Sequence, residues 1–470
     1  MKIFTRLFLL LMSCTGGHSY AQNNQEANES VFRKVKGYVN ARNDDSLYAL
    51  LNDDFKARFD KAKFSGILKN NLYPMGAIEK TTLISYGEGV SNYKTVCAKA
   101  VIEFRIGTDK TGKIYTLQFL EYKEPAATKN YVVATDNPMR SALDSQVDKI
   151  AGNYINKVST VGLSIGILKK GVTTIYGYGE TAKGNNHVPG PDAEFEIASI
   201  TKTFTGTLLA YYVLEHKISL SDPITKYLPD SVAANRNLQQ ITVQMLSNHT
   251  SGLARIPDNM LDADMLNPYK NYNRQKLFTY LKNGTLQSVP GEKYAYSNLG
   301  AGLLGTILEG ISGRSYEQMV TDIICRPSGM ANTYQHPDAK QKVRQVSVYN
   351  EKGEPVIMWE TDALAGAGAL RSCTHDLLLY SEGNMKKDGS RLSGAMELTH
   401  HITYDKEMSI GLGWHKAEVA GMDCYWHNGG TAGSSSYIGF VPAHNIAVVV
   451  LSNAAERADA VAEGILKILK

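Results

Sequence analysis

Cysteine is scarce in this chain, with five in 470 residues. Cys14 lies in the N-terminal leader, and the other four are widely separated and form no C-x-x-C pair: Cys97, Cys325, Cys373 and Cys424. That spacing does not support a zinc or redox-active motif. Four cysteines could form up to two disulfide bonds whose pairing the sequence does not give, but we expect them to be small buried hydrophobic residues.

The chain also lacks a charge excess and the short motifs of several protein classes. Lys and Arg number 50 against 46 Asp and Glu, a net charge of +4, which is too small to indicate a nucleic-acid partner. There is no H-E-x-x-H and no G-x-x-x-x-G-K-[ST] phosphate loop, so metallohydrolase and nucleotide-dependent chemistry are unsupported and we expect neither metal nor cofactor. Apolar residues at 43% and charged residues at 20% are typical of a soluble globular protein.

No stretch is apolar for long enough to span a membrane, which takes roughly 18 residues. The apolar run 7–12 near the N-terminus follows Lys2 and Arg6 and precedes small and polar residues ending at Ala21. This pattern predicts a signal peptide, residues 1–21, and a periplasmic or secreted protein. Lipoprotein processing at Cys14 is the less favoured alternative.

The remaining length, at about 150 residues per domain, predicts two or three domains. Residues 22–122 read as a small α+β accessory domain, with helical spacing near the start and paired strands near 101–104 and 114–120. Residues 123–139 contain Pro and small residues and read as a linker. We assign residues 140–470 to the main domain.

Both ends of the main domain carry strand and helix patterns. An apolar helical stripe follows Pro138, and a hairpin is expected from strands 161–168 and 172–178. Strands are expected again at 437–441 and 446–451, followed by a helix. These patterns predict one antiparallel sheet assembled from both ends and covered by helices, with a mostly helical middle near 200–400.

A serine and a lysine lie three residues apart at the start of a predicted helix. Ser199 and Lys202 precede the apolar stretch 204–214, and the spacing places both side chains on one helix face. A serine hydroxyl becomes a good nucleophile when a neighbouring base takes its proton. Alone, such a tetrad is more often a helix cap beside a solvated lysine.

Two further motifs follow in the order Y-x-N, then H-x-G. Tyr296 and Asn298 lie in a loop before a helical stretch, and His427 and Gly429 lie at the end of a predicted strand. A core tyrosine and a surface histidine are the ordinary explanations of these residues. The order of the three motifs and their separation, about 100 and then about 130 residues, favour a catalytic constellation.

With these motifs the chain resembles the serine β-lactamase and penicillin-binding protein superfamily, in its class C-like branch, over about residues 140–470. That branch includes D,D-peptidases, D-aminopeptidases and esterases. The resemblance extends to stretches 246–253, 365–370, 411–414 and 448–453. It implies a β-lactamase-like antiparallel sheet flanked by helices with a helical subdomain, an overall α+β or α/β class, and a structural role for His249.

The resemblance also implies catalytic roles. Ser199 would attack the substrate carbonyl and become acylated, with Lys202 and Tyr296 as proton-transfer partners. Both side chains have pKa values near 10 in water, about 10.4 and about 10, and the sequence does not say which is the base. Asn298 would bind the substrate amide and orient Lys202, and the backbone N–H groups of Ser199 and Gly430 would form the oxyanion hole.

The third motif departs from the lysine-containing K-T-G of many β-lactamases, because this chain has His427 and Gly429 in an H-x-G. An unperturbed histidine is only partly charged at neutral pH, so recognition of a substrate carboxylate should be weaker and more dependent on pH. We therefore expect peptidase or esterase activity on β-lactam, D-amino-acid peptide or ester substrates, in preference to efficient penicillin hydrolysis.

Two alternatives remain open at this point. Ser164 lies in a G-x-S-x-G sequence typical of another hydrolase fold, but the residues after it continue a strand into a hairpin, so we interpret it as a strand residue. The chain could also be a penicillin-binding sensor or scaffold with little or no turnover, which a measurement of product release would distinguish. The oligomeric state is not predicted.

Overall fold

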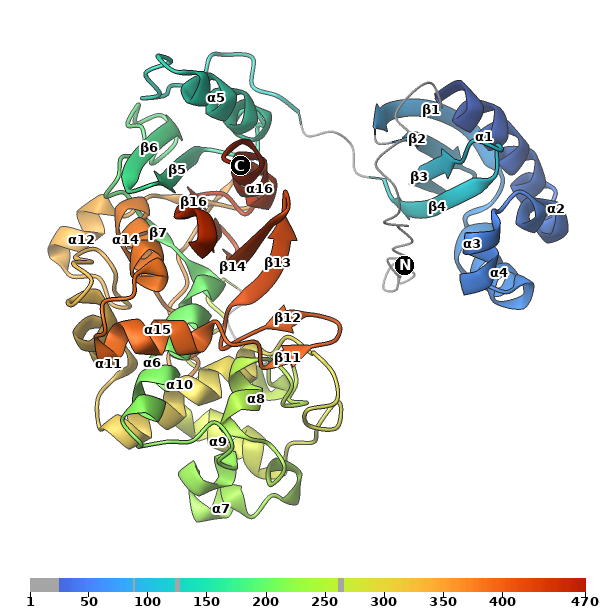
Figure 1. The fold of residues 1–470 in the computed structure, drawn as a ribbon. Helices are drawn as coiled ribbons and strands as arrows, with labels where there is room; N and C mark the ends of the chain where they lie inside the picture. The colour runs from blue at the N-terminus through green and yellow to red at the C-terminus, as the bar shows by residue number, and fades with distance from the viewer. Residues whose placement is uncertain (1–24, 88, 123–126, 261–265) are drawn as a thin grey trace. The chain divides into compact units, whose positions relative to one another are not determined.

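The computed structural model describes residues 25–87, 89–122, 127–260 and 266–470. Residues 25–122 and 127–470 form two separate compact units, each with its own hydrophobic core (Figure 1). The point of division lies within the segment predicted as a linker. The predicted signal peptide, with Cys14 and Ala21, lies outside the described residues. No described helix is long and apolar enough to cross a membrane.

The first unit is a four-stranded antiparallel sheet, in the order β1-β2-β3-β4, with helices packed against it. Its core includes Phe32 of α1, whose ring stacks on Tyr93 at 4.1 Å between centroids. The sequence pattern predicts β3 and β4 but neither β1 nor β2. The side chains of β1 are mostly exposed and therefore show no apolar alternation. The elements are α1 (Gln25–Asn40), α2 (Asp44–Ala49), α3 (Asp53–Arg58), α4 (Lys61–Ile67), β1 (Ile78–Gly87), β2 (Val90–Cys97), β3 (Ala100–Thr108) and β4 (Ile114–Glu121).

The second unit is built on an eight-stranded antiparallel sheet in the order β11-β12-β13-β14-β15-β16-β5-β6. Strands from the two ends of the unit meet where β16 pairs with β5, which confirms the predicted assembly. Two small sheets, β7 with β10 and β8 with β9, lie outside it. The strands are β5 (Gly162–Lys169), β6 (Val172–Gly179), β7 (Glu194–Glu196), β8 (Val348–Tyr349), β9 (Pro355–Val356), β10 (Arg371–Cys373), β11 (Tyr404–Asp405), β12 (Ser409–Ile410), β13 (His415–Val419), β14 (Met422–Gly430), β15 (Ser435–Val441) and β16 (Ile446–Ser452).

Helices cover both faces of this sheet. Alternate residues of a strand point to opposite faces, and apolar side chains on each face need a cover. On β16, Val448 and Val450 pack with α5 and α16, whereas Val449 and Leu451 belong to the larger core with α6 and α14. The helices that cover the sheet are α5 (Ala142–Ile155), α6 (Thr201–Leu214), α14 (Thr374–Met385), α15 (Arg391–Thr399) and α16 (Asp459–Ile468). The rest form the predicted helical region: α7 (Asp230–Ala233), α8 (Val243–Ser247), α9 (Arg274–Asn283), α10 (Asn298–Ser312), α11 (Tyr316–Met319), α12 (Ala339–Arg344) and α13 (Ala365–Gly368).

The first strand of the hairpin contains Ser164. Lys170 and Gly171 both have positive φ, +52° and +81°, which suits a two-residue turn between right-twisted strands. Ser164 is fully buried on β5 and accepts a hydrogen bond from Thr374 Oγ1 at 2.7 Å. It is a strand residue, as interpreted from the sequence. The four cysteines of the described chain are free and buried, which confirms their role as small core residues.

Candidate active site

Ser199 lies on a short 3-10 turn, η3 (Ala198–Ile200), that leads directly into α6. Ser199 is half-buried, whereas Lys202, one turn later, is only 3% exposed. Ala198 has a φ of +47°, a left-handed conformation that is strained for a residue with a Cβ. The sharp turn places Ser199 at a cavity wall while α6 continues into the core.

The amine of Lys202 is surrounded by three oxygen atoms. Its Nζ lies 3.0 Å from Ser199 Oγ, 2.9 Å from Asn298 Oδ1 and 2.6 Å from the Ala367 carbonyl oxygen. Burial, and then the positive charge of Arg255, hold the pKa of Lys202 well below its usual range. The structure therefore brings the S-x-x-K and Y-x-N motifs together, 96 residues apart in sequence, at one amine.

The aromatic ring of Tyr296 packs against the same amine. The Lys202 Nζ lies 4.8 Å from the centroid of its ring, and the Arg255 guanidinium lies 5.0 Å from it. Burial raises the pKa of Tyr296 to about 12, although a hydrogen bond with Ser199 and the charge of Arg255 act in the opposite direction. Tyr296 is therefore a neutral phenol at pH 7.

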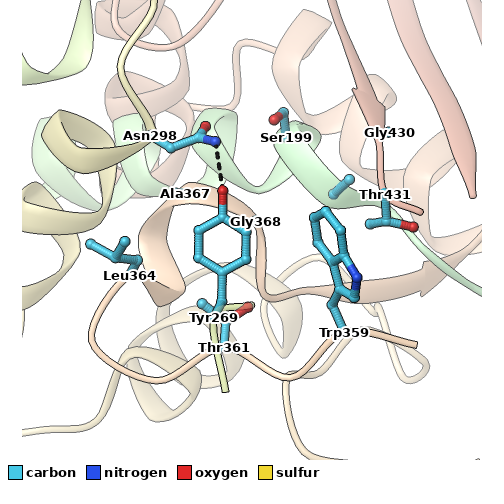
Figure 2. A pocket seen from close by; sticks show the side chains of 11 residues that line it. Ser199, Tyr269, Asn298, Trp359, Thr361, Leu364, Ala367, Gly368, Gly430 and Thr431 are labelled. Atoms are coloured by element: carbon cyan, nitrogen blue, oxygen red, sulfur yellow. Dashed lines mark hydrogen bonds between the residues drawn. The ribbon is translucent and has the colours of Figure 1, made fainter. Parts of the chain in front are cut away.

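Asn298 is fixed by the start of α10. Ser297 caps this helix, since its Oγ accepts a hydrogen bond from the Gly300 N–H at 2.9 Å. The Asn298 side chain then reaches in two directions: its Oδ1 lies at Lys202, and its Nδ2 donates to the Tyr269 hydroxyl at 3.1 Å (Figure 2). One amide therefore holds both the buried amine and a tyrosine of the cavity wall.

The end of β14 packs directly against the turn that carries Ser199. A Cβ built on Gly429 would lie 2.5 Å from the Ile197 carbonyl oxygen and 2.9 Å from the Ser199 amide nitrogen. Only a glycine allows this approach. A Cβ built on Gly430 would meet no atom closer than 3.7 Å, so the steric requirement lies at Gly429.

His427 lies in the same strand but is buried, with 1% of its surface exposed. Burial, and then the charges of His415 and Lys202, hold its pKa well below its usual range. Its Nδ1 lies 2.7 Å from the Asn428 carbonyl oxygen, so this nitrogen carries the proton and donates. The sequence predicts a partly charged histidine; the structure makes it a neutral one, with Nε2 as the acceptor, because neighbouring groups bury it.

His427 belongs to a buried cluster of aromatic and imidazole rings. Its ring centroid lies 5.0 Å from that of His415, and the ring of His249 lies 4.3 Å from that of Tyr296. The His249 Nδ1 accepts a hydrogen bond from the Ser297 N–H at 3.2 Å, which agrees with the structural role expected from the sequence. Among the described residues, no three His, Cys, Asp or Glu side chains gather as a metal site requires.

The cavity beside Ser199 has a volume of about 40 Å³. Figure 2 shows Tyr269, Trp359 and Leu364 forming one side of it, facing Ser199. The buried carboxylate of Glu196 ties this wall to the sheet, because it accepts hydrogen bonds from the Trp359 N–H at 2.7 Å, the Thr431 hydroxyl at 2.8 Å and the Ser434 hydroxyl at 2.9 Å.

Sequence reasoning missed the wall residues Tyr269 and Trp359, as well as Arg255. No local motif marks them, although Arg255 lies two residues after the family-like stretch 246–253. It also missed the contribution of Ala367, which acts through its backbone carbonyl and therefore has no side-chain signature.

Comparison with known proteins gives the same family as the motifs. The family model described as Beta-lactamase matches residues 147–469. A Beta-lactamase of Lysobacter lactamgenus is 25% identical over 350 residues, covering 67% of this chain and 88% of its own length. The D-alanyl-D-alanine-carboxypeptidase/endopeptidase AmpH of Escherichia coli (strain K12) is 28% identical over 322 residues, covering 65% of this chain and 82% of its own length.

Solved structures agree with these relatives. The crystal structure of a class C beta lactamase superposes with a TM-score of 0.64 at 26% identity, covering 71% of this chain and 99% of that one. The residues matched by the family model, 147–469, lie within the second unit, with its eight-stranded sheet and flanking helices. The chain therefore belongs to the beta-lactamase family and is a serine hydrolase.

Proposed function

We propose that this protein is an exported hydrolase that forms an acyl-enzyme on Ser199 and acts on amide or ester substrates. The observation that carries the proposal is the contact of the buried Lys202 amine with Ser199 Oγ, at 3.0 Å. A hydrolase needs a base within hydrogen-bond reach of its nucleophile, with a pKa near the working pH. Lys202 meets the first condition, and its lowered pKa moves it toward the second.

The partners of Lys202 favour it as the base over Tyr296. A neutral amine has two N–H donors and one lone pair. The Ala367 carbonyl and Asn298 Oδ1 can only accept, so they take the two N–H groups, and the lone pair is left for the Ser199 O–H. Tyr296, with its pKa raised to about 12, keeps its proton and can act as a donor.

Acylation then follows with balanced proton transfers. Ser199 Oγ attacks the carbonyl carbon while its proton passes to Lys202 Nζ, and the N–H groups of Ser199 and Gly430 stabilise the oxyanion. The C–N or C–O bond of the substrate breaks, and the leaving group takes a proton from Lys202 through the Tyr296 hydroxyl. Water attacks the resulting ester, and the same groups return the proton to Ser199 as the acid departs.

We further propose a preference for peptides or esters over penicillins. The neutral His427 supports this preference, because the H-x-G strand itself offers no permanent positive charge at the position where many β-lactamases have a lysine that faces the substrate carboxylate. The relatives leave both activities open, since one is named a Beta-lactamase and another a carboxypeptidase/endopeptidase. The cavity beside Ser199 is small, and the Tyr269 and Trp359 rings that line it pack against each other at 5.5 Å between centroids, which suits a small acyl group better than a bulky one.

The test is covalent labelling followed by intact mass measurement, with a fluorescent penicillin, a D-Ala-D-Ala peptide and a short-chain activated ester. We expect an adduct of one acyl group, with product release from the ester or peptide faster than from penicillin. Ser199→Ala should lose the adduct and remain folded, whereas Ser164→Ala, which changes a buried strand serine, should keep it. An adduct on Ser199→Ala, or none on the parent protein, would contradict the proposal, and an adduct without product release would identify a sensor.

Export is part of the same proposal. It is supported by the charged and apolar pattern of residues 1–21. The mass of the protein recovered after expression in a bacterium should correspond to a chain beginning at residue 22. A chain beginning at Cys14 with attached lipid would instead identify a lipoprotein, and an uncleaved chain in the cytoplasm would overturn export.

A further inference from the structure

Arg255 occupies a defined position beside the proposed catalytic groups. Its backbone carbonyl accepts hydrogen bonds from the N–H groups of Asn298, at 2.9 Å, and Leu299, at 3.3 Å. These bonds fix its Cα at the start of α10. Its guanidinium lies 5.0 Å from the centroid of the Tyr296 ring, and its side chain is exposed to solvent.

The guanidinium of Arg255 has no hydrogen-bond or acidic partner among the residues that the structure describes. Two other arginines near the site differ in this respect. Arg457 forms a double hydrogen bond with Asp459, at 2.8 and 3.0 Å, and the buried Arg371 donates to the carbonyls of Gln335 and Trp359. Arg255 therefore carries N–H donors beside Tyr296 that no described residue accepts.

The local charge also favours an anion. The Arg255 guanidinium lies over the Tyr296 ring, and the carboxylate of Glu196 is buried and occupied by three donors. A guanidinium binds a carboxylate through two parallel hydrogen bonds, and such a charge-assisted pair is about twice as strong as a neutral one. Neutral His427 cannot supply this interaction.

We propose that Arg255 is a specificity-determining residue that binds a carboxylate of the substrate close to the scissile bond. This inference rests on the proposed function, and it names the substrate class: acidic esters and amides. The carboxylate can lie on the acyl portion or on the leaving group, since both portions of a substrate at Ser199 lie near Tyr296. Matched esters that carry the carboxylate on one portion or the other distinguish these two positions.

The test compares kcat/KM for matched neutral and acidic esters. The p-nitrophenyl esters of valeric acid and of glutaric acid differ by a carboxylate on the acyl portion, and phenyl acetate and 3-carboxyphenyl acetate differ by one on the leaving group. At a pH above the acid limb of the rate profile, where Lys202 is already deprotonated in both proteins, we expect Arg255→Gln to lower kcat/KM for the acidic member of one pair roughly 10- to 100-fold, and for its neutral member less than about threefold. The pair affected identifies the position of the carboxylate.

Arg255→Lys and a remote arginine provide the controls. The lysine variant keeps the charge but not the fork, so its ratio of acidic to neutral activity should lie between those of the parent and the glutamine variant. Arg391 is exposed and paired with Glu215 at 2.9 Å, so Arg391→Gln should leave every ratio unchanged. The preference for the acidic ester should also weaken as salt is added.

The outcomes separate this inference from the proposed function. Turnover of the neutral esters through Ser199, with unchanged ratios in Arg255→Gln for both pairs, would overturn the role of Arg255 and leave the hydrolase intact. Loss of all labelling in the parent protein would overturn both. An equal loss on acidic and neutral esters would show that Arg255 acts through folding or through Lys202, and would also overturn substrate recognition.

Discussion

At the scale of single residues, the pH dependence of acylation should belong to Lys202. Its folded-state pKa is lowered, so the amine is protonated at low pH and becomes a base as the pH rises through that lowered value. The acylation rate should therefore fall on the acid side. Arginine stays protonated throughout, so Lys202→Arg should reduce the rate at least about 100-fold from pH 5 to pH 9.

Measurement of adduct formation by intact mass across this pH range tests the assignment. Arg255→Gln is the matched variant, because it removes a positive charge that lowers the Lys202 pKa, and its acid limb should move to higher pH for neutral and acidic substrates alike. A Lys202→Arg protein that acylates within tenfold of the parent would rule out Lys202 as the base.

At the scale of elements, the junction between η3 and β14 decides whether the site assembles. Gly429→Ala would place a methyl group 2.5 Å from both the Ile197 carbonyl oxygen and Ser436 Oγ. The Ser436 hydroxyl already donates a hydrogen bond to the Ile197 carbonyl oxygen at 2.9 Å, so the strand must move away from the turn to admit the methyl group. We expect a loss of about 1–3 kcal/mol of stability and at least a tenfold loss of acylation.

Gly430→Ala is the matched control for stability. Its Cβ would have ordinary contacts at 3.7 and 3.8 Å, so its thermal unfolding midpoint should stay near that of the parent, well above that of Gly429→Ala. Thermal unfolding and acylation rates of the two variants give the comparison. Equal midpoints would show that β14 does not need a glycine at 429.

Many of the helices and strands of the second unit could be predicted, because the signals for them lie in short stretches of sequence. The β5–β6 hairpin has two strands of apolar residues around a short turn, and the α6 and α10 helices follow recognisable motifs. The positions of Tyr269, Trp359 and Arg255 could not be predicted, because only tertiary packing brings them to Ser199. The neutral state of His427 was missed for the same reason, since it depends on burial beside His415 and Lys202.

At the scale of the whole molecule, the two units have independent cores. The core of residues 25–122 contains no residue of the second unit, and the family match begins at residue 147. The proposed catalytic groups all lie in the second unit, including Arg255. Nothing in the chemistry proposed for Ser199 therefore requires a side chain from the first unit.

Stability of the second unit should fall in acid, because it buries neutral histidines. Burial lowers the pKa of His400 and of His415 to about 4. The unfolded chain takes up a proton near pH 6.5 and the folded chain does not until about pH 4, so stability is lost as the pH falls through that window. At pH 5 each histidine lowers the free energy of unfolding by at most about 2 kcal/mol relative to its value at pH 7.

His400 lies outside the proposed site and isolates this effect. Its Nε2 lies 3.0 Å from Asn384 Oδ1, a contact that the amide of His400→Gln can replace without a titratable group. Denaturant unfolding at pH 7 and pH 5 should show a smaller loss of stability in the variant than in the parent, by up to about 2 kcal/mol. The carboxylates are the same in both proteins, so their titration cancels in this difference, and an identical loss in the two would show that His400 is already protonated in the folded state.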